Sequence, residues 1–370
     1  MSRLLVTGGA GFIGSNFVHY WIQRHPEDRL VVLDSLTYAG NLANLAAAAD
    51  HPSYRFVRGD IRDQELVEEL LVSEGLETIV HLAAESHVDR SISGPDIFVD
   101  VNINGTHSLL KAARRVWLDS HAEEFDRPRF HHVSTDEVYG SLAPSEPAFS
   151  ESTPYSPNSP YAASKAASDH LVRAYQHTYG LPTSISNCSN NYGPYQFPEK
   201  LIPLCIVNLL VGKALPIYGD GQNVRDWLHV EDHCRGIESI LVDGRIGQTY
   251  NIGSRNEQTN LDLVRLLCQS VDKLFAGRPE LCDRYPEAPP SRGRPCETAI
   301  DFVTDRPGHD RRYAIDSGRI EEELGFGSTI AFDNGMDSTV FWFVDNEPWW
   351  RSVMDESYRE WMTDQYGDQE

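Results

Sequence analysis

The sequence contains few positively charged residues and no long hydrophobic runs. Its 370 residues include 32 Lys or Arg against 55 Asp or Glu, a formal net charge of −23 at pH 7. Nucleic acids and anionic membranes are polyanions and would repel so acidic a protein. No apolar run approaches the roughly 18 residues that a membrane-spanning helix requires. We therefore expect neither nucleic acid nor membrane as a partner.

Lysine is scarcer than arginine, and the reason stays open. An acid-rich, lysine-poor surface is typical of proteins that remain soluble in high salt, where hydrated carboxylates keep the chain in solution. An arginine-rich, GC-biased genome encoding an ordinarily acidic enzyme would give the same pattern. Lysine occurs only at Lys111, Lys165, Lys200, Lys213 and Lys273.

The sequence also lacks recognisable targeting and metal-binding patterns. Arg3 is followed by a short apolar run that enters a glycine turn, too short for the hydrophobic region of a signal peptide. We expect a cytoplasmic protein with reduced thiols and no metal site. No CxxC pair and no histidine at zinc spacing accompanies the six scattered cysteines Cys188, Cys205, Cys234, Cys268, Cys282 and Cys296.

A glycine-rich turn follows the first apolar run. Gly8, Gly9, Gly11 and Gly14 can be read as G-x-G-x-x-G or G-x-x-G-x-x-G, between a strand-like run and a helical periodicity. Such glycines let the backbone approach a pyrophosphate, whose charge a helix N-terminus favours. Asp34 ends the next apolar run, twenty residues after Gly14, where a carboxylate can hold the adenosine ribose hydroxyls and repel a 2′-phosphate. The pattern predicts an NAD site.

Strand-like and helical patterns then alternate. Apolar runs at 54–57, 78–84 and 130–134 read as strands, and 102–117 reads as a helix. Repeated βαβ units predict an α/β fold, a Rossmann-type doubly wound parallel sheet with a smaller C-terminal substrate-binding lobe. We expect an NAD-binding domain over 1–190, a nucleotide-sugar-binding lobe over 191–330 with the chain interleaving between lobes, and a docked C-terminal tail over 331–370.

The stretch 130–165 contains more reactive groups than a fold requires. Tyr161 and Lys165 stand four residues apart in a predicted helix, so both side chains lie on one face. A lysine ammonium beside a tyrosine stabilises the phenolate and lowers a pKa that is ordinarily about 10. Tyr161 can then act as a general base. Thr135, or Ser134, at the end of the preceding strand would orient the reacting alcohol.

These features resemble the extended, nucleotide-sugar-modifying branch of the short-chain dehydrogenase/reductase superfamily, and within it the 4,6-dehydratases. The resemblance covers roughly residues 3 to 325. It rests on HLAAESHVDRS at 81–91, STDEVYG at 134–140, NCSNNYGP at 187–194 and DRPGH at 305–309. It implies a lyase that forms a 4-keto-6-deoxy sugar from dTDP-glucose with bound NAD. A 4,6-dehydratase or 4-epimerase for another nucleotide sugar is the alternative.

The resemblance also implies the catalytic roles. Tyr161, beside Lys165, takes the 4-hydroxyl proton, and Thr135 orients that hydroxyl. Asp136 is the acid toward the hydroxyl that leaves carbon 6, and Glu137 is the base at carbon 5. Asp136 needs a raised pKa for this, which burial and an adjacent carboxylate would supply. Since oxidation alone needs only the tyrosine and the lysine, the acid pair favours a dehydratase over an epimerase.

The remaining contacts and the assembly are likewise implied by resemblance. Implied NAD contacts are Gly8, Gly11, Phe12, Ile13, Gly14, Asp34, Ser35, Leu36, Thr37, Asp60, Ile61, Leu82, Ala83, Ala84, Ser86, Tyr161, Lys165 and Asn191. Implied substrate contacts are Ser86, His87, Arg90, Thr135, Asn190, Lys200, Leu201, Pro216, Ile217, Tyr218, Arg225, Asn260, Arg306 and His309. The cations among them suit a diphosphate. A homodimer is expected, paired through the helix after Asn102 and the helix that carries Tyr161.

Overall fold

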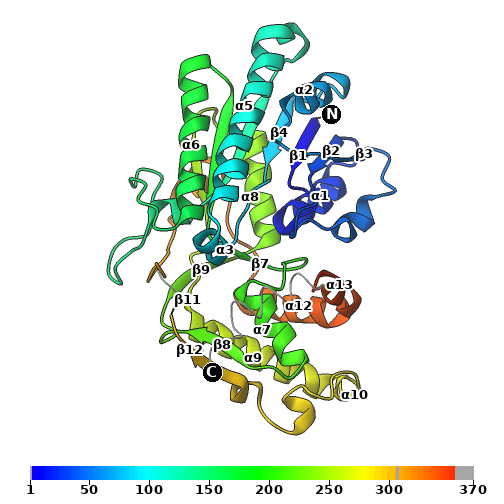
Figure 1. Cartoon of the computed structure of the whole chain (residues 1–370), viewed down its shortest axis with the longest axis vertical. Coiled ribbons are helices and arrows are strands. Elements are labelled where there is room, and N and C mark those ends of the chain that lie inside the picture. The colour runs from blue at the N-terminus through cyan, green and yellow to red at the C-terminus, as the bar shows by residue number, and fades with distance from the viewer. Residues whose placement is uncertain (1, 306–307, 355–370) are drawn as a thin grey trace.

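The structure is a computed structural model that describes residues 2–305 and 308–354. Its centre is a seven-stranded sheet of order β10-β6-β5-β4-β1-β2-β3, in which every pairing is parallel (Figure 1). The strands are β1 (Arg3–Thr7), β2 (Arg29–Asp34), β3 (Tyr54–Arg58), β4 (Thr78–His81), β5 (Arg129–Thr135), β6 (Thr183–Cys188) and β10 (Thr249–Ile252). The strand order reverses between β1 and β4, where such sheets bind ligands. The expected doubly wound α/β fold is confirmed.

Helices cover both faces of this sheet. On β1, Leu4 and Val6 join one buried cluster while Leu5 joins another, because successive side chains point to opposite faces. Helices α1 (Phe12–Arg24), α8 (Val230–Asp243) and α11 (Gly318–Leu324) pack on the first face. Helices α2 (Gln64–Ser73), α5 (Thr106–Arg114) and α6 (Pro160–Tyr179) pack on the second. Burial on both faces explains why the strands read as continuous apolar runs.

The helix expected over 102–117 is longer in the structure. It runs as α4 (Asp96–Phe98), a π-helical segment (Val99–Gly105), α5, and a second π-helical segment (Arg115–Ser120). Pro95 stands at its N-terminal end, where a missing amide hydrogen costs no intrahelical bond. The 3.6-residue period does not reveal this start, because Val99–Gly105 is π-helical and departs from that period. Helix α3 (Val88–Ser93) precedes it.

A second lobe lies beyond the carboxyl edge of the sheet, at the bottom of Figure 1. It contains the strand sets β11-β9-β7 and β12-β8. Its strands are β7 (Asn190–Tyr192), β8 (Leu215–Tyr218), β9 (Val224–His229), β11 (Glu257–Thr259) and β12 (Ile300–Val303). Its helices are α7 (Leu201–Leu210), α9 (Asn260–Gly277), α10 (Leu281–Arg284), α12 (Phe332–Asp345) and α13 (Glu347–Val353).

The chain passes between the two lobes more than once. Strand β10 and helix α8 come from the stretch assigned to the second lobe, yet they belong to the large sheet and its covering layer. Helices α12 and α13 pack into the core of the second lobe, where Met336, Phe343 and Trp350 are fully buried. The limits of the three expected segments stay a prediction.

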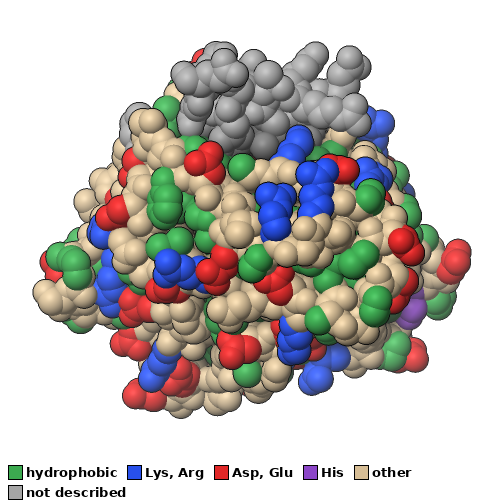
Figure 2. Space-filling model, turned by 90° about the horizontal axis from the view of Figure 1, so that it is seen from below, with side chains coloured by type: hydrophobic (Ala, Val, Ile, Leu, Met, Phe, Trp, Pro, Cys, Tyr) green, Lys and Arg blue, Asp and Glu red, His purple; other side chains and the backbone are tan. Residues whose placement is uncertain are grey.

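The surface carries charges of both signs. On the face seen from below, Asp and Glu side chains are interspersed with Arg and Lys (Figure 2). In the described part of the chain, no helix is long and apolar enough to cross a membrane. Residues 2–305 and 308–354 also contain no group of three or more His, Cys, Asp or Glu side chains that could hold a metal ion.

Candidate active site

A cavity of about 330 Å³ opens at the carboxyl ends of the central strands. Most of the expected NAD contacts line it: Gly8, Gly11, Phe12, Ile13, Gly14, Asp34, Ser35, Thr37, Asp60, Ile61, Leu82, Ala83, Ala84, Ser86, Tyr161, Lys165 and Asn191. Leu36 is the exception. It adopts a positive φ of 55°, and its backbone N–H donates to Asp34.

The glycine turn forms one wall of the cavity. Gly8 has a φ of +72°, and a Cβ there would lie 2.6 Å from the backbone of Ala83. A Cβ on Gly14 would lie 2.2 Å from the Gly8 carbonyl oxygen, so side chains are excluded at both positions. Helix α1 begins directly after Gly11, without a side-chain cap and without an acidic residue in its first turn. Its N-terminus therefore suits a pyrophosphate.

Asp34 is held rigidly at the end of β2. Its Oδ2 accepts from the Ala10 N–H at 2.9 Å, and its Oδ1 accepts from the Leu36 N–H at 2.8 Å. Burial raises the pKa of Asp34, and these two amide hydrogen bonds oppose the rise. A carboxylate accepts about four hydrogen bonds, which leaves two for ribose hydroxyls. The glycine turn and Asp34 together fit a dinucleotide without a 2′-phosphate.

Tyr161 and Lys165 reach the cavity from the first turns of α6, and both are buried. Burial lowers the pKa of Lys165 to about 8, and the Asp169 carboxylate opposes that change. The expected lowering of the Tyr161 pKa is not seen, because burial and then the Glu137 carboxylate raise it. The Lys165 amine instead donates to the Val133 carbonyl, 2.8 Å away.

The acid pair follows β5 in a 3₁₀ turn, Asp136–Tyr139. Thr135 caps this turn by accepting from the Glu137 N–H at 3.3 Å, so the acids are not needed as caps. Asp136 is 1% exposed, and its Oδ2 has no hydrogen-bond partner within the described residues. Burial, then the carboxylates of Glu137 and Asp226, raise the pKa of Asp136 well above its usual value. Its pKa is therefore shifted in the direction that a general acid requires, and it stands beside Glu137, which lines the cavity.

The expected substrate contacts fall into two groups. The first group lies at the cavity. Ser86, Thr135, Asn190 and Lys200 line it, and the Lys200 amine donates to the Ser86 carbonyl at 2.9 Å. Next to them, His87 caps α3, Arg90 forms an ion pair with the lining residue Glu199, and Leu201 begins α7.

The second group belongs to the other lobe and does not line this cavity. Pro216, Ile217 and Tyr218 form β8, Arg225 lies on β9, Asn260 begins α9, and His309 packs edge-on against Tyr218. The Ile217 side chain is 1% exposed and belongs to the core of this lobe. The Arg225 guanidinium acts on Asp136 and opposes the rise of its pKa, which places it near the acid pair. Arg306 lies outside the described residues.

The family model described as GDP-mannose 4,6 dehydratase matches residues 5–339. A dTDP-glucose 4,6-dehydratase of Neisseria meningitidis is 50% identical over 97% of this chain and 98% of its own length. A solved dTDP-glucose 4,6-dehydratase of Streptomyces venezuelae, with NAD bound, is 48% identical over 95% of this chain and 99% of its own, with a TM-score of 0.82. The Bacillus anthracis enzyme in complex with NAD is 43% identical over 95% of this chain and 100% of its own, also with a TM-score of 0.82.

The chain belongs to the dTDP-glucose 4,6-dehydratase family.

Several residues that line the cavity were not predicted from the sequence, and Glu199 is the most informative of them. It is buried, and it accepts from the Tyr38 hydroxyl at 3.1 Å and the Arg90 Nε at 3.2 Å. Its position directly before Lys200, in a segment rich in ligand-contacting residue types, was the available signal. The other missed lining residues are Leu33, Ala39, Gly40, Gly59, Arg62, Glu85, Ile97, Val133, Cys188, Ser189, Gln196 and Phe197.

Proposed function

We propose that the protein converts dTDP-glucose to dTDP-4-keto-6-deoxyglucose and water. The observation that carries this proposal is the acid pair beside Tyr161. Asp136 is kept neutral by burial and by two neighbouring carboxylates, while Glu137 faces the cavity. Elimination of water needs an acid for the leaving hydroxyl and a base for the adjacent carbon, whereas epimerisation needs neither. The family membership supports the same reaction.

NAD is the cofactor of this proposal, and the residues present fit it. The glycine turn at α1 would hold the pyrophosphate, Asp34 the adenosine ribose, and Lys165 the nicotinamide ribose. Bound NAD supplies a positively charged ring that accepts a hydride from carbon 4 of the sugar and gives it back at carbon 6. The proteins of Streptomyces venezuelae and Bacillus anthracis were both solved with NAD.

The protein side chains move the protons. Tyr161 takes the proton of the 4-hydroxyl, for which its raised pKa must be offset by nearby positive charge. The ketone formed at carbon 4 acidifies the proton on carbon 5, which Glu137 removes. Asp136 gives its proton to the hydroxyl that leaves carbon 6 as water. A proton returned to carbon 5 completes the product.

Incubation of the protein with dTDP-glucose in deuterated water tests this proposal. We expect a product lighter by one water, with deuterium at carbon 5 and a carbonyl at carbon 4. A product of unchanged mass without deuterium at carbon 5 would show a 4-epimerase instead. A panel of dTDP-, UDP-, CDP- and GDP-sugars decides the nucleotide, and activity on another base alone would contradict the dTDP assignment.

Homodimerisation and a cytoplasmic location are part of the same proposal. Exposed apolar side chains lie on and beside the helices expected to pair, which supports a contact there: Ile92, Ile97, Val99 and Tyr179 are 42%, 44%, 47% and 44% exposed. Light scattering should give the mass of two chains, and a single-chain mass would refute the dimer. Cell fractionation tests the location.

A further inference from the structure

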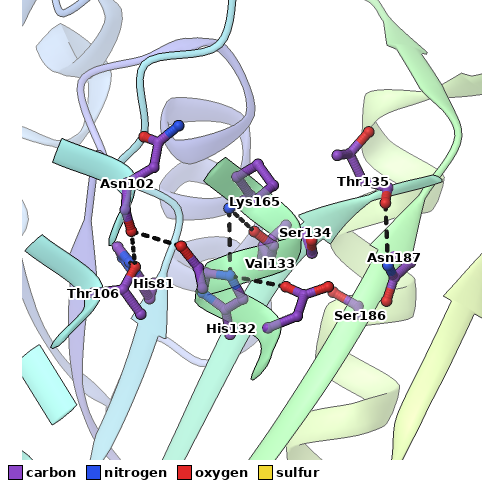
Figure 3. A network of polar contacts seen from close by, with 12 residues as sticks. His81, Asn102, Thr106, His132, Val133, Ser134, Thr135, Lys165, Ser186 and Asn187 are labelled. Atoms are coloured by element: carbon purple, nitrogen blue, oxygen red, sulfur yellow. Dashed lines mark hydrogen bonds and ion pairs between the residues drawn. The ribbon is translucent and has the colours of Figure 1, made fainter. Parts of the chain in front are cut away.

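Behind the active-site lysine lies a buried pair of residues that the reaction as proposed does not use. The Lys165 Nζ lies 3.4 Å from His132 Nε2, and that same nitrogen lies 3.3 Å from Asp169 Oδ1. Lys165 is 4% exposed, and His132 and Asp169 are fully buried. Figure 3 shows the Lys165 amine pointing at the His132 ring and at the Val133 carbonyl. His132 and Asp169 are not among the residues that line the cavity.

Asp169 is anchored as an anion from its other side. Its Oδ2 accepts from the Tyr155 hydroxyl at 2.7 Å, and that hydroxyl accepts from Arg173 Nη2, also at 2.7 Å. Burial alone would raise the pKa of Asp169, but His132, Lys165 and Tyr155 hold it below its usual value. A fully buried carboxylate therefore stands one imidazole away from the buried ammonium of Lys165.

His132 can serve only one of its two neighbours at a time. Burial, then the charge of Lys165, lower its pKa to about 4, so the ring is neutral at working pH. Protonated at Nε2, the ring donates to Asp169; protonated at Nδ1, it accepts from Lys165 at Nε2. Asp169 Oδ1 lies 3.3 Å from His132 Nε2, and neither Asp169 Oδ1 nor His132 Nδ1 has a hydrogen-bond partner among the described residues. The imidazole thus links the proton on Lys165 to the carboxylate behind it.

We propose that His132 and Asp169 are positioning residues that keep Lys165 charged and fixed in the cavity wall, and thereby set the alkaline limit of catalysis. The inference rests on the proposed function only for the role of Lys165. Among the described residues, the ionisable groups whose electrostatics couple to that amine include His81 on β4, His132 on β5, Cys188 on β6 and Asp169 on α6. Tyr161 and Glu137 line the same cavity as Lys165, and Asp136 stands beside Glu137.

The expected sign follows from charge. Asp169 favours the ammonium form of Lys165, so Asp169→Asn should lower the pKa of Lys165 below its value of about 8. The pH at which kcat declines on the alkaline side of the profile should therefore be lower, by about one pH unit for the loss of a close buried charge. On the acid side of the profile, where Lys165 stays protonated, kcat should change little. KM should stay within about twofold, since neither residue lines the cavity.

Two pairs of variants make the test specific. His132→Gln keeps an N–H near the position of Nε2, so the alkaline limb of its kcat–pH profile should stay near that of the wild type. The shorter side chain of His132→Asn does not reach that position, so the alkaline limb of this variant should shift to lower pH. Tyr155→Phe removes only the hydroxyl that donates to Asp169, so it should shift the limb in the same direction as Asp169→Asn, but by less. NAD content and the unfolding temperature of each variant are measured alongside.

A readout independent of turnover completes the experiment. Competitive labelling with acetic anhydride across pH, followed by mass spectrometry, reports the pKa of Lys165, with the exposed Lys111 as internal control. We expect a lower pKa for Lys165 in Asp169→Asn and no change for Lys111. Folded, NAD-loaded Asp169→Asn with an unshifted Lys165 pKa and an unshifted limb would overturn the inference. If the wild-type protein has no dehydratase activity but the pKa of Lys165 is still lower in Asp169→Asn than in the wild type, the proposed function is refuted. The control of Lys165 by Asp169 then still stands.

Discussion

The two sides of the cavity are built in different ways. On the side expected to hold the cofactor, the cavity wall includes the backbone turn from Gly8 to Gly14 and the carboxylate of Asp34. On the reaction side, single side chains arrive from β5, α6 and the loop before α7, and their behaviour depends on burial. The cofactor side therefore depends on the conformation of the backbone, whereas the reaction side depends on the charge states of its side chains. Four predictions, made on three substitutions, probe this difference, beginning with the largest expected effect.

Tyr161→Phe should strongly reduce catalysis while leaving the binding of NAD unchanged. Loss of a general base costs typically 10²- to 10⁴-fold in rate, so we expect kcat to fall by about that factor. Bound NAD per chain should be unchanged, because the hydroxyl is removed and the ring stays. Steady-state kinetics and the NAD content of purified protein measure both. A fall in kcat of less than about tenfold would argue against Tyr161 as the base.

Asp136→Asn should separate the elimination from the oxidation. The amide cannot give a proton to the leaving hydroxyl, so dehydration should slow by about 10²-fold or more. Glu137 remains, so deuterium should still enter carbon 5 from solvent. Mass spectrometry of the recovered sugar distinguishes the two events. Loss of both in a folded, NAD-loaded variant would mean that Asp136 acts before the elimination.

Gly14→Ala should damage only the cofactor side. Its Cβ would lie 2.2 Å from the Gly8 carbonyl oxygen, so the turn must shift away from the pyrophosphate. We expect NAD affinity to fall by about tenfold, which corresponds to about 1.4 kcal/mol. Gly277→Ala is the matched control, since a Cβ there meets nothing within 4 Å. Equal NAD affinity in both variants, measured by calorimetry, would contradict this account of the turn.

The smallest effect concerns stability. The folded-state pKa of Asp136 is raised above its ordinary value of 3.8, so ionisation of this buried group destabilises the fold as pH rises through that raised pKa. Asp136→Asn has no charge to bury and should melt about 2 °C higher at alkaline pH. Below pH 3.8, where both folded and unfolded Asp136 are protonated, the difference should vanish. Calorimetric melts across pH check the sign, and a less stable variant at alkaline pH would refute the burial argument.

Particular elements show why some features could be predicted and others could not. The glycine turn and Asp34 are recognised because their function lies in a local backbone conformation that residue spacing encodes. The N-terminal turns of the helix that starts near Pro95 were missed because part of them is π-helical and departs from the 3.6-residue period by which helices are recognised. Ile217 is expected at the substrate, and its side chain is buried in the core of its lobe, so a contact with the substrate would have to use its backbone.

The sequence by itself determined the α/β fold, the dinucleotide turn and the reactive residues of 130–165, because spacing and residue type decide these. Tertiary structure alone decided the protonation states. Burial keeps Asp136 neutral, raises the pKa of Tyr161 where its neighbour on the helix predicted a lowering, and places Asp169 behind Lys165 through His132. A pKa depends on how much water and which charges surround a group, and distant segments of the chain supply both.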